Sequence, residues 1–200
     1  MSSAPSRSSG NARDPFGAAL QRGLADVRTA LEAVDALNPV VLIDGRSGAG
    51  KSTLARMLVA AWPTPGRVQL VALDSIYPGW DGLAEGVGIA LRDILVPHAR
   101  GMIGVWRRFD WEVDAAAEAH AVDPSLPLIV EGAGILTAQT RRLCDVAVWM
   151  ESPVNSRRRR ALDRDGDLYR PHWERWARQE ETHLAEHAPG ALASVTVAVP

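Results

Sequence analysis

The sequence predicts an α/β fold in which a parallel sheet of five strands is flanked by helices on both faces. Short, almost entirely apolar runs recur along the chain, separated by segments of helical periodicity and by turns rich in Pro and Gly. Strands that alternate with helices form parallel sheets, and continuous apolar runs are typical of strands buried on both faces. One of these runs leads directly into a glycine-rich turn that opens a helix. These observations predict a single layered domain.

The chain before the first strand is predicted to hold a disordered tail and one helix. Residues 1–15 are rich in Ser, Pro, Gly and Arg and offer little to bury. From Phe16 to Leu37, apolar residues recur in alternating steps of four and three, the spacing of one helix face: Leu20, Leu24, Val27, Leu31 and Val34. We expect this helix to pack on the sheet. A seam between two copies is the alternative for the helix, and a basic arm on a partner for the tail.

The predicted strands and helices then alternate to the end of the chain. Strands are expected at residues 40–44, 68–73, 128–132, 146–150 and 195–199. Helices are expected after the first strand, at residues 83–96, just after Trp111, from Pro153 onward and at residues 172–186. Because the sequence contains no internal repeat, we expect residues 16–200 to form one domain, with a lid at about residues 157–171.

The glycine-rich turn has the P-loop pattern G-x-x-x-x-G-K-[ST]. It consists of Gly45, Arg46, Ser47, Gly48, Ala49, Gly50, Lys51, Ser52 and Thr53. A strand before this turn and a helix after it are the context that the pattern requires, whereas a chance turn would lack that register. Its backbone N–H groups and the helix N-terminus attract phosphate, Lys51 reaches the β- and γ-phosphates, and Ser52 ligates Mg²⁺. The sequence therefore predicts a three-layer P-loop NTPase fold that binds ATP and Mg²⁺.

The sequence contains 22 lysines and arginines together, and 21 of them are arginines. Lys51 is therefore the only lysine in the protein. A compact ammonium acts as a point charge between phosphates, a role for which a planar guanidinium is a poor replacement. An arginine-rich composition explains why lysine is scarce but does not explain where the one lysine lies. We interpret Lys51 as a catalytic residue as well as a nucleotide ligand.

Two carboxylates end predicted strands, and we expect them on the same rim as the P-loop. Asp74 follows the second strand and Glu131 ends the third. Ligands of open parallel sheets bind at the carboxyl ends of the strands. Asp74 is therefore a candidate for the base that accepts a proton from a substrate hydroxyl, or for a metal ligand, and Glu131 for a second Mg²⁺ ligand. A simple turn or helix-capping role is the alternative for Asp74.

Aromatic and charged residues gather in two segments that follow Asp74. Trp80 lies in an aromatic loop just beyond this carboxylate, and residues 105–111 combine Arg108, Asp110 and Trp111 with a further Trp and Arg. Such a mixture suits a pocket that stacks a flat ring and bonds polar substituents. An edge strand with ordinary aromatic packing is the alternative.

Arginines cluster in the predicted lid. Residues 157–160 are four consecutive arginines, and Arg164 and Arg170 follow. At helical spacing the run points in several directions, so some of these guanidiniums are solvated while others could cover the triphosphate and offset charge that develops during transfer.

Composition excludes several classes of function. The formal net charge is −2 and the pI is about 6.2, which gives no general attraction to nucleic acid or to anionic membranes. Cys144 is the only cysteine, so no internal disulfide forms, and no apolar run approaches the length of a membrane span. We therefore expect a cytoplasmic protein without nucleic-acid or membrane partners, either alone or as a homo-oligomer.

Five separated blocks together resemble the uridine kinase branch of the P-loop kinases. They are residues 45–53, Leu-Asp-Ser-Ile-Tyr at 73–77, Arg-Phe-Asp-Trp at 108–111, Ile-Val-Glu-Gly at 129–132, and the arginine-rich lid that ends at Asp167. The resemblance implies transfer of the γ-phosphoryl of ATP to a nucleoside hydroxyl. It also implies that Asp74 is the base or a metal ligand, that Ser52 and Glu131 hold Mg²⁺, and that Tyr77 and Asp110 contact the acceptor. The lid residues that it implies are Arg158, Arg160 and Arg164, and we assign Arg160 and Arg164 a catalytic role.

Other functions remain open at the level of sequence. The acceptor could be a nucleoside monophosphate or another alcohol, because Arg107 and Arg108 would suit a phosphorylated molecule. A regulatory ATPase would hydrolyse ATP without any small acceptor. A guanine-specific switch is excluded, because it would need a second lysine in its base-reading loop.

Overall fold

The computed structural model describes residues 14–200. The predicted disordered tail, residues 1–15, lies almost entirely outside this range. Its last two residues belong to the first helix instead: α1 spans Pro15–Glu32, and the side chain of Asp14 caps it by accepting a hydrogen bond from the Phe16 N–H at 3.1 Å. Pro15 occupies the first helical position, where a missing N–H carries no cost.

Five parallel strands form the central sheet in the order β2-β5-β1-β6-β7. They span Gln69–Ala72 for β2, Leu128–Glu131 for β5, Val40–Gly45 for β1, Val146–Glu151 for β6 and Val195–Ala198 for β7. The three middle strands are almost completely buried, as their apolar runs predict. The order puts the carboxyl end of β1 beside that of β5, with β2 next to β5. The predicted α/β fold with five parallel strands is confirmed.

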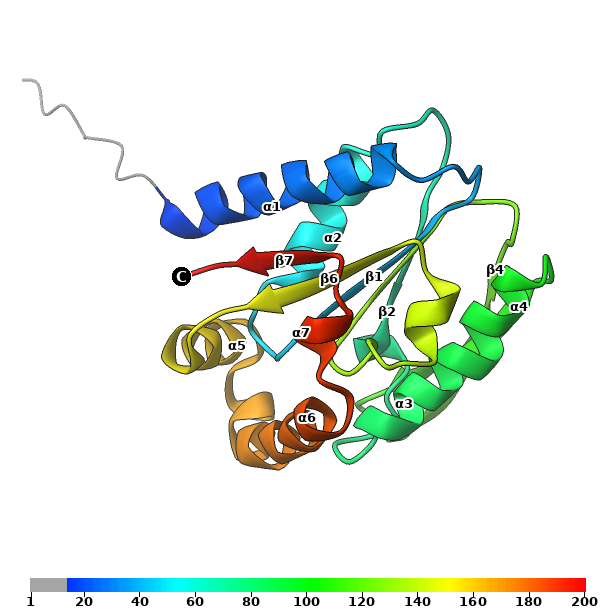
Figure 1. The fold of residues 1–200 in the computed structure, drawn as a ribbon. Coiled ribbons are helices and arrows are strands. Elements are labelled where there is room, and N and C mark those ends of the chain that lie inside the picture. The colour runs from blue at the N-terminus through cyan, green and yellow to red at the C-terminus, as the bar shows by residue number, and fades with distance from the viewer. Residues whose placement is uncertain (1–13) are drawn as a thin grey trace, which may run out of the picture.

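Helices cover both faces of the sheet (Figure 1). On one face α1 and α2 (Lys51–Ala60) pack against a core that includes Val41, Ile43 and Val148. On the other face α3 (Leu83–Ile89), α5 (Val154–Tyr169) and α6 (Trp173–His187) enclose a second core around Leu42 and Val130. Neighbouring residues of β1 thus point into different cores, which explains why the strand is apolar without alternation.

Helix α1 packs on the sheet, as the spacing of its apolar residues predicts. Leu20, Val27 and Leu31 are at most 5% exposed, and the helix lies along β7. At Gly23 a Cβ would stand 2.4 Å from the Val197 side chain, so the small residue permits this close approach. Each buried Leu or Val contributes about 1.5–3 kcal/mol.

The segment after Trp111 differs from the prediction. We expected helical residues there, but β3 (Gly104–Asp110) and β4 (Ala115–Val122) form a separate antiparallel hairpin. The alanines of β4 favour helix locally, yet β4 pairs with β3 on both sides of a register shift between Arg107 and Phe109. Asp114, with a φ of 51°, makes the turn between the two strands. Tertiary pairing therefore overrides helix propensity here.

Short elements complete the chain. They are η1 (Leu73–Ser75), a π-helical turn η2 (Ala90–Leu95), α4 (Val96–Ala99), η3 (Thr140–Leu143), η4 (Arg170–His172) and α7 (Pro189–Leu192). Within the part of the chain from Asp14 onward, none of the helices combines the length and the apolar character needed to cross a membrane.

Candidate active site

The P-loop at residues 45–53 adopts a conformation that requires glycine at two points. Gly48 and Gly50 have φ angles of 77° and 101°, in the left-handed region that favours glycine. A Cβ at Gly48 would stand 2.1 Å from the Arg157 carbonyl oxygen, so the loop is pressed against the start of α5. The chain then enters α2 at Lys51, whose first N–H groups face the loop. This geometry is that of an anion-binding loop at a helix N-terminus.

Lys51 lies inside this loop rather than in solvent. Its side chain is 9% exposed, and its Nζ donates to the Arg46 carbonyl oxygen at 3.3 Å. Its positive charge also acts on Glu131, where it lowers the pKa of the carboxyl against the larger effect of burial. The only lysine of the protein is therefore held where the loop and the metal-binding candidates meet.

Glu131 and Asp74 lie on one rim, as the sequence predicts, but in different environments. Glu131 ends β5 and is 4% exposed, and burial raises the pKa of its carboxyl. The charge of Asp74 raises this pKa further, while Lys51 and the Ser52 hydroxyl lower it. Asp74, in η1, has a side chain that is 58% exposed. One carboxylate is thus buried beside the P-loop, and the other is open to an incoming molecule.

The oxygen atoms of Ser52, Glu131 and Asp74 suit Mg²⁺, which prefers hard ligands and binds through one or two carboxylates together with phosphates. No group of three or more His, Cys, Asp or Glu side chains within residues 14–200 could hold a metal by itself. A Mg²⁺ ion here would complete its shell with water and with the phosphates of a nucleotide. The residues present therefore fit Mg²⁺ bound jointly with ATP.

Arg164 is the lid arginine that reaches the rim. Its Nη2 lies 3.9 Å from the Asp74 carboxylate and 2.7 Å from that of Asp165. Two residues later, Gly166 interrupts α5 with a φ of 58° and a ψ of −135°, so the predicted lid bends there. Because its side chain is 52% exposed, Arg164 is free to exchange one of these carboxylates for a phosphate.

We predicted that Arg160 covers the triphosphate, but in the structure its guanidinium bonds to backbone carbonyl oxygens instead. Its Nε donates to the Gly48 carbonyl oxygen at 2.8 Å and its Nη1 to the Pro200 carbonyl oxygen at 2.6 Å, while the guanidinium stacks on the Phe16 ring. Arg157 likewise donates to the Ser47 carbonyl oxygen at 3.2 Å. These arginines therefore hold the backbone of the loop at Ser47 and Gly48 through its carbonyl oxygens. Arg158, which the resemblance also implies as a lid residue, is exposed, and its side chain makes no hydrogen bond or ion pair within residues 14–200.

An aromatic cluster lies beyond Asp74. The Trp80 ring stacks on His172 at 4.2 Å and on Tyr169 at 5.4 Å, and Trp111 packs against it at 4.8 Å. Trp111 also donates from Nε1 to the Asp74 carbonyl oxygen at 2.8 Å. The cluster joins the end of the lid to the loop that carries Asp74. Trp111, predicted as a substrate contact, thus lies next to Asp74, and Trp80, predicted likewise, packs against Trp111.

Tyr77 lies deeper than a surface contact with the acceptor would require. It is 1% exposed, its hydroxyl donates to the Ala133 carbonyl oxygen at 2.7 Å, and its ring packs edge-on against Trp176. The structure therefore gives Tyr77 a core role beneath the rim. Burial, the largest effect, raises the pKa of its hydroxyl well above the usual value.

Arg108 and Asp110 pair with each other on the hairpin. The guanidinium of Arg108 lies 3.0 Å from Asp110 and 2.7 Å from Glu118. Hydrogen bonding to Arg108 and to the Glu112 N–H lowers the pKa of Asp110. Both predicted contact residues are thus already engaged by charged partners.

Three residues near the P-loop were missed by the sequence analysis. Glu180 of α6 is 3% exposed and accepts hydrogen bonds from the Ser47 N–H at 2.6 Å and from Arg46 Nε at 2.9 Å. Asp44 and His183 form a buried contact of 3.1 Å directly before the loop. The one signal in the sequence is Asp44 itself, a charged residue that follows four apolar residues of a strand.

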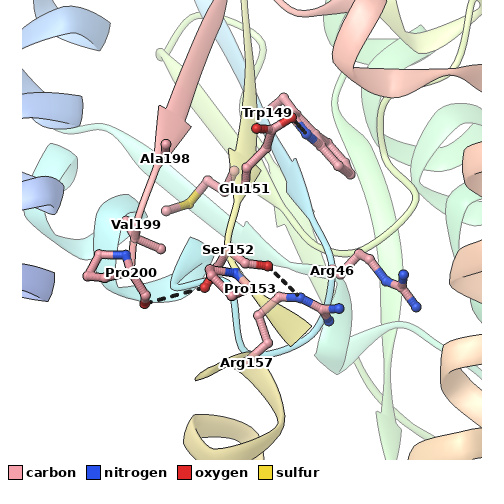
Figure 2. A pocket seen from close by; sticks show the side chains of 10 residues that line it. Arg46, Trp149, Glu151, Ser152, Pro153, Arg157, Ala198, Val199 and Pro200 are labelled. Carbon is pink, nitrogen blue, oxygen red and sulfur yellow. Dashed lines mark hydrogen bonds between the residues drawn. The ribbon is translucent and has the colours of Figure 1, made fainter. Parts of the chain in front are cut away.

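A pocket of about 610 Å³ lies where β6 and β7 end and α5 begins (Figure 2). Its walls include Arg46 of the P-loop, Trp149, Arg157 and Pro200, and Figure 2 shows Arg157 bonded to Ser152 at its floor. In the strand order β6 and β7 lie on the opposite side of β1 from β5 and β2. The pocket is therefore beside the nucleotide loop but on the far side of β1 from Asp74 and Glu131.

Comparison with solved structures identifies the fold. A possible uridine kinase from Bacillus stearothermophilus matches with a TM-score of 0.65 and 19% identity, covering 88% of this chain and 98% of its own. A candidate fructose transport system kinase from Silicibacter sp. TM1040 matches with a TM-score of 0.57 and 22% identity, covering 87% and 98%. No protein-family model and no curated protein sequence matches the chain.

At these identities the likeness is one of fold, and the fold is that of P-loop kinases. The resemblance that the five sequence blocks predict is therefore confirmed at that level. The coverage of 98% of each neighbour means that the shared fold extends over the whole of their chains, including the sheet and the helices on both of its faces.

Proposed function

We propose that this protein is an ATP-dependent kinase that transfers the γ-phosphoryl group to a hydroxyl of a small molecule, with a nucleoside such as uridine or cytidine as the first candidate. The observation that carries the proposal is the rim itself. A P-loop with a buried lysine, a buried carboxylate and an exposed carboxylate paired with a lid arginine lie together. Phosphoryl transfer consists mostly of positioning and charge neutralisation, and these residues supply both.

On the nucleotide side, the loop residues would bind the phosphates of ATP. The N–H groups of residues 48–53 would donate to phosphate oxygens, and Lys51 would place its ammonium between the β- and γ-phosphates. Ser52 and Glu131 would hold Mg²⁺, which when bound neutralises phosphate charge. The raised pKa of Glu131 favours a cation here, because a buried carboxylate gains most from a positive partner.

On the acceptor side, Asp74 would act as the base. An exposed carboxylate at the end of η1 is open to a hydroxyl group and would accept its proton as the oxygen attacks phosphorus. Arg164, now 3.9 Å from Asp74, would turn toward the transferred group and offset its charge. Asp74 would also keep a contact to the metal shell through water.

The acceptor is proposed to be uncharged and to carry a flat ring. Trp111, which is 38% exposed and bonded to the Asp74 carbonyl oxygen, offers aromatic surface that suits a nucleobase, and Trp80 supports it from behind. Arg108 is paired with Asp110 and Glu118, two carboxylates that would compete with a phosphate for its guanidinium. This competition is why we place a nucleoside before a nucleoside monophosphate. The name of one neighbour, a possible uridine kinase, agrees with this choice, while the other neighbour's name refers to fructose.

The proposal is tested by incubating the protein with Mg-ATP and single acceptors, and by detecting a phosphorylated product by mass spectrometry. The acceptors are uridine, cytidine, deoxynucleosides, their monophosphates, pantothenate and simple sugar alcohols. We expect one class of nucleosides to gain a mass of one phosphoryl group and to stimulate ADP release. Tight ATP binding and slow hydrolysis that no acceptor stimulates would instead favour a regulatory ATPase.

A further inference from the structure

Asp44 is a buried carboxylate that the proposed chemistry does not use. It is the residue before Gly45 at the end of β1 and is 1% exposed. Its two oxygens accept four hydrogen bonds, from the N–H groups of Gly45 at 2.6 Å, Gly134 at 2.9 Å and Leu136 at 2.8 Å, and from His183 Nε2 at 3.1 Å. Both oxygens are therefore fully engaged.

These bonds tie together the two loops that carry the metal-binding candidates. Gly45 opens the P-loop that ends at Ser52, while Gly134 and Leu136 belong to the loop that begins directly after Glu131. The Gly132 N–H adds a bond to the Ile43 carbonyl oxygen at 3.1 Å. The loop after Glu131 is thus anchored to the end of β1 at three successive points, and Asp44 supplies two of them.

His183 fixes the orientation of this carboxylate from a third element. It lies on α6, is 7% exposed, and stands 139 positions from Asp44 in the chain. In the tautomer that carries its proton on Nε2, His183 donates to this carboxylate. One turn earlier on α6, Glu180 holds the Ser47 N–H. Helix α6 therefore contacts the P-loop through two side chains on one face.

We propose that Asp44, oriented by His183, is a positioning residue that fixes Glu131 relative to Ser52 at the separation that Mg²⁺ requires. The inference rests on the proposed function, because it assigns Glu131 and Ser52 to the metal. A carboxylate that only stabilised the strand could do so with one oxygen that accepts one hydrogen bond, whereas Asp44 uses both oxygens and accepts four. Asp145 shows this simpler use at the other end of β1, where a single oxygen accepts the Val40 N–H at 2.8 Å.

The variants follow from this geometry. In Asp44→Asn the amide keeps one accepting oxygen, but its NH₂ group faces N–H donors, so at least one loop bond is lost. His183→Ala removes the orienting donor, whereas His183→Gln retains an N–H donor at a similar reach. Asp145→Asn is the control, since Asp145 precedes β6 and its carboxylate accepts a backbone N–H of β1 at the end of the strand that lies far from the rim.

We expect three readouts to change together in Asp44→Asn. The amides of Gly134 and Leu136 exchange hydrogen faster, the Mg²⁺ concentration needed for half-maximal turnover rises, and turnover falls by about 10–100-fold, the loss typical of residues that orient metal ligands. Metal-free ATP affinity changes little. His183→Ala shows a smaller change of the same kind, His183→Gln restores it, and Asp145→Asn lowers only thermal stability.

Two results would overturn the proposal. If Asp44→Asn and Asp145→Asn lose similar thermal stability while the Mg²⁺ dependence of each matches the wild type, Asp44 is purely structural. If Asp44→Asn does not fold, the two His183 variants provide the test instead. Equal Mg²⁺ dependence of turnover in His183→Ala and His183→Gln would show that His183 does not orient Asp44. A wild type that binds no Mg-ATP at all would refute the proposed function itself, a result distinct from either of these.

Discussion

The nucleotide side and the acceptor side of the rim are built by different means. The P-loop is enclosed: Lys51 is 9% exposed and Glu131 4%, and the loop is held by Glu180 on one side and by Arg157 and Arg160 on the other. Across the rim, Asp74 and Arg164 have side chains that are 58% and 52% exposed. A loop that is already ordered loses little entropy when a ligand binds, whereas exposed groups adjust to the molecule that arrives.

This contrast suggests that the buried side binds the nucleotide and that the exposed side binds the acceptor. Triphosphate and Mg²⁺ need fixed donors at fixed distances, which buried groups provide. The proposed acceptor side instead has the stack of Trp80 with His172 and the exposed side chains of Asp74 and Arg164. Changes on the two sides should therefore separate affinity for ATP from turnover, and each prediction below uses this separation.

Asp74→Asn should have the largest effect on chemistry. Removing the base leaves the P-loop untouched, so we expect turnover with the active acceptor to fall by about 10²–10⁴-fold. Steady-state ADP release checks this result. Asp81→Asn, which alters an exposed carboxylate in the same loop region, is the control and should retain most of the activity. Unchanged turnover in Asp74→Asn would remove Asp74 from the reaction.

Lys51→Ala should weaken both ATP binding and turnover. Losing a desolvated charge that contacts phosphates is expected to lower affinity about 100-fold, within the range for buried charged partners. Lys51→Arg should restore little, because a planar guanidinium cannot replace the compact ammonium. Because Lys51 is the only lysine, an amine-directed label that ATP blocks must report on this residue or on the N-terminus. ATP affinity equal to that of the wild type would contradict the role of Lys51.

Trp80→Ala should act on the acceptor side alone. Four ring contacts are lost, so we expect the KM for the acceptor to rise about 10-fold while the affinity for ATP stays constant. Trp62→Ala, in the turn that follows α2, is the matched control for removing an indole. Equal changes in the two variants would mean that the aromatic cluster has only a structural role.

Glu131→Gln should slightly stabilise the nucleotide-free protein. Burial raises the pKa of Glu131, so the folded state binds this proton more tightly than the unfolded chain, and the ionised carboxylate destabilises the fold at pH 7. The penalty disappears as the pH falls through the folded pKa. We expect Tm at pH 7 to rise by about 2–4 °C, the shift that ~1 kcal/mol produces in a chain of this size, and the gain to vanish in acid. A lower Tm at pH 7 would contradict this account of the charge.

The P-loop, the five strands and the two rim carboxylates could be predicted because their signals are local. A strand, a glycine-rich turn and a helix in register define residues 45–53, and the carboxyl ends of parallel strands share one edge. The hairpin could not be predicted, because alanines at 115–121 favour helix until β3 pairs with them. Strand pairing is a contact between two segments, so the periodicity of residues within one segment cannot predict it.

The direction in which individual side chains point could not be predicted from the sequence either. A run of four arginines on a helix gives no indication that Arg160 turns toward the P-loop carbonyls while Arg164 turns toward Asp74. Glu180 and His183 reach the P-loop region from more than 130 positions away, a relation that only the packing of α6 creates. The missed residues are those that support the site from outside.

The affinity of Asp74→Asn for Mg-ATP, measured by calorimetry beside the wild type, tests the central claim most directly. The account predicts dissociation constants that agree closely, because Asp74 lies outside the enclosed loop, even though turnover with the acceptor falls by orders of magnitude. A loss of ATP affinity in parallel with the loss of turnover would contradict it, since the two sides of the rim would then act as one unit.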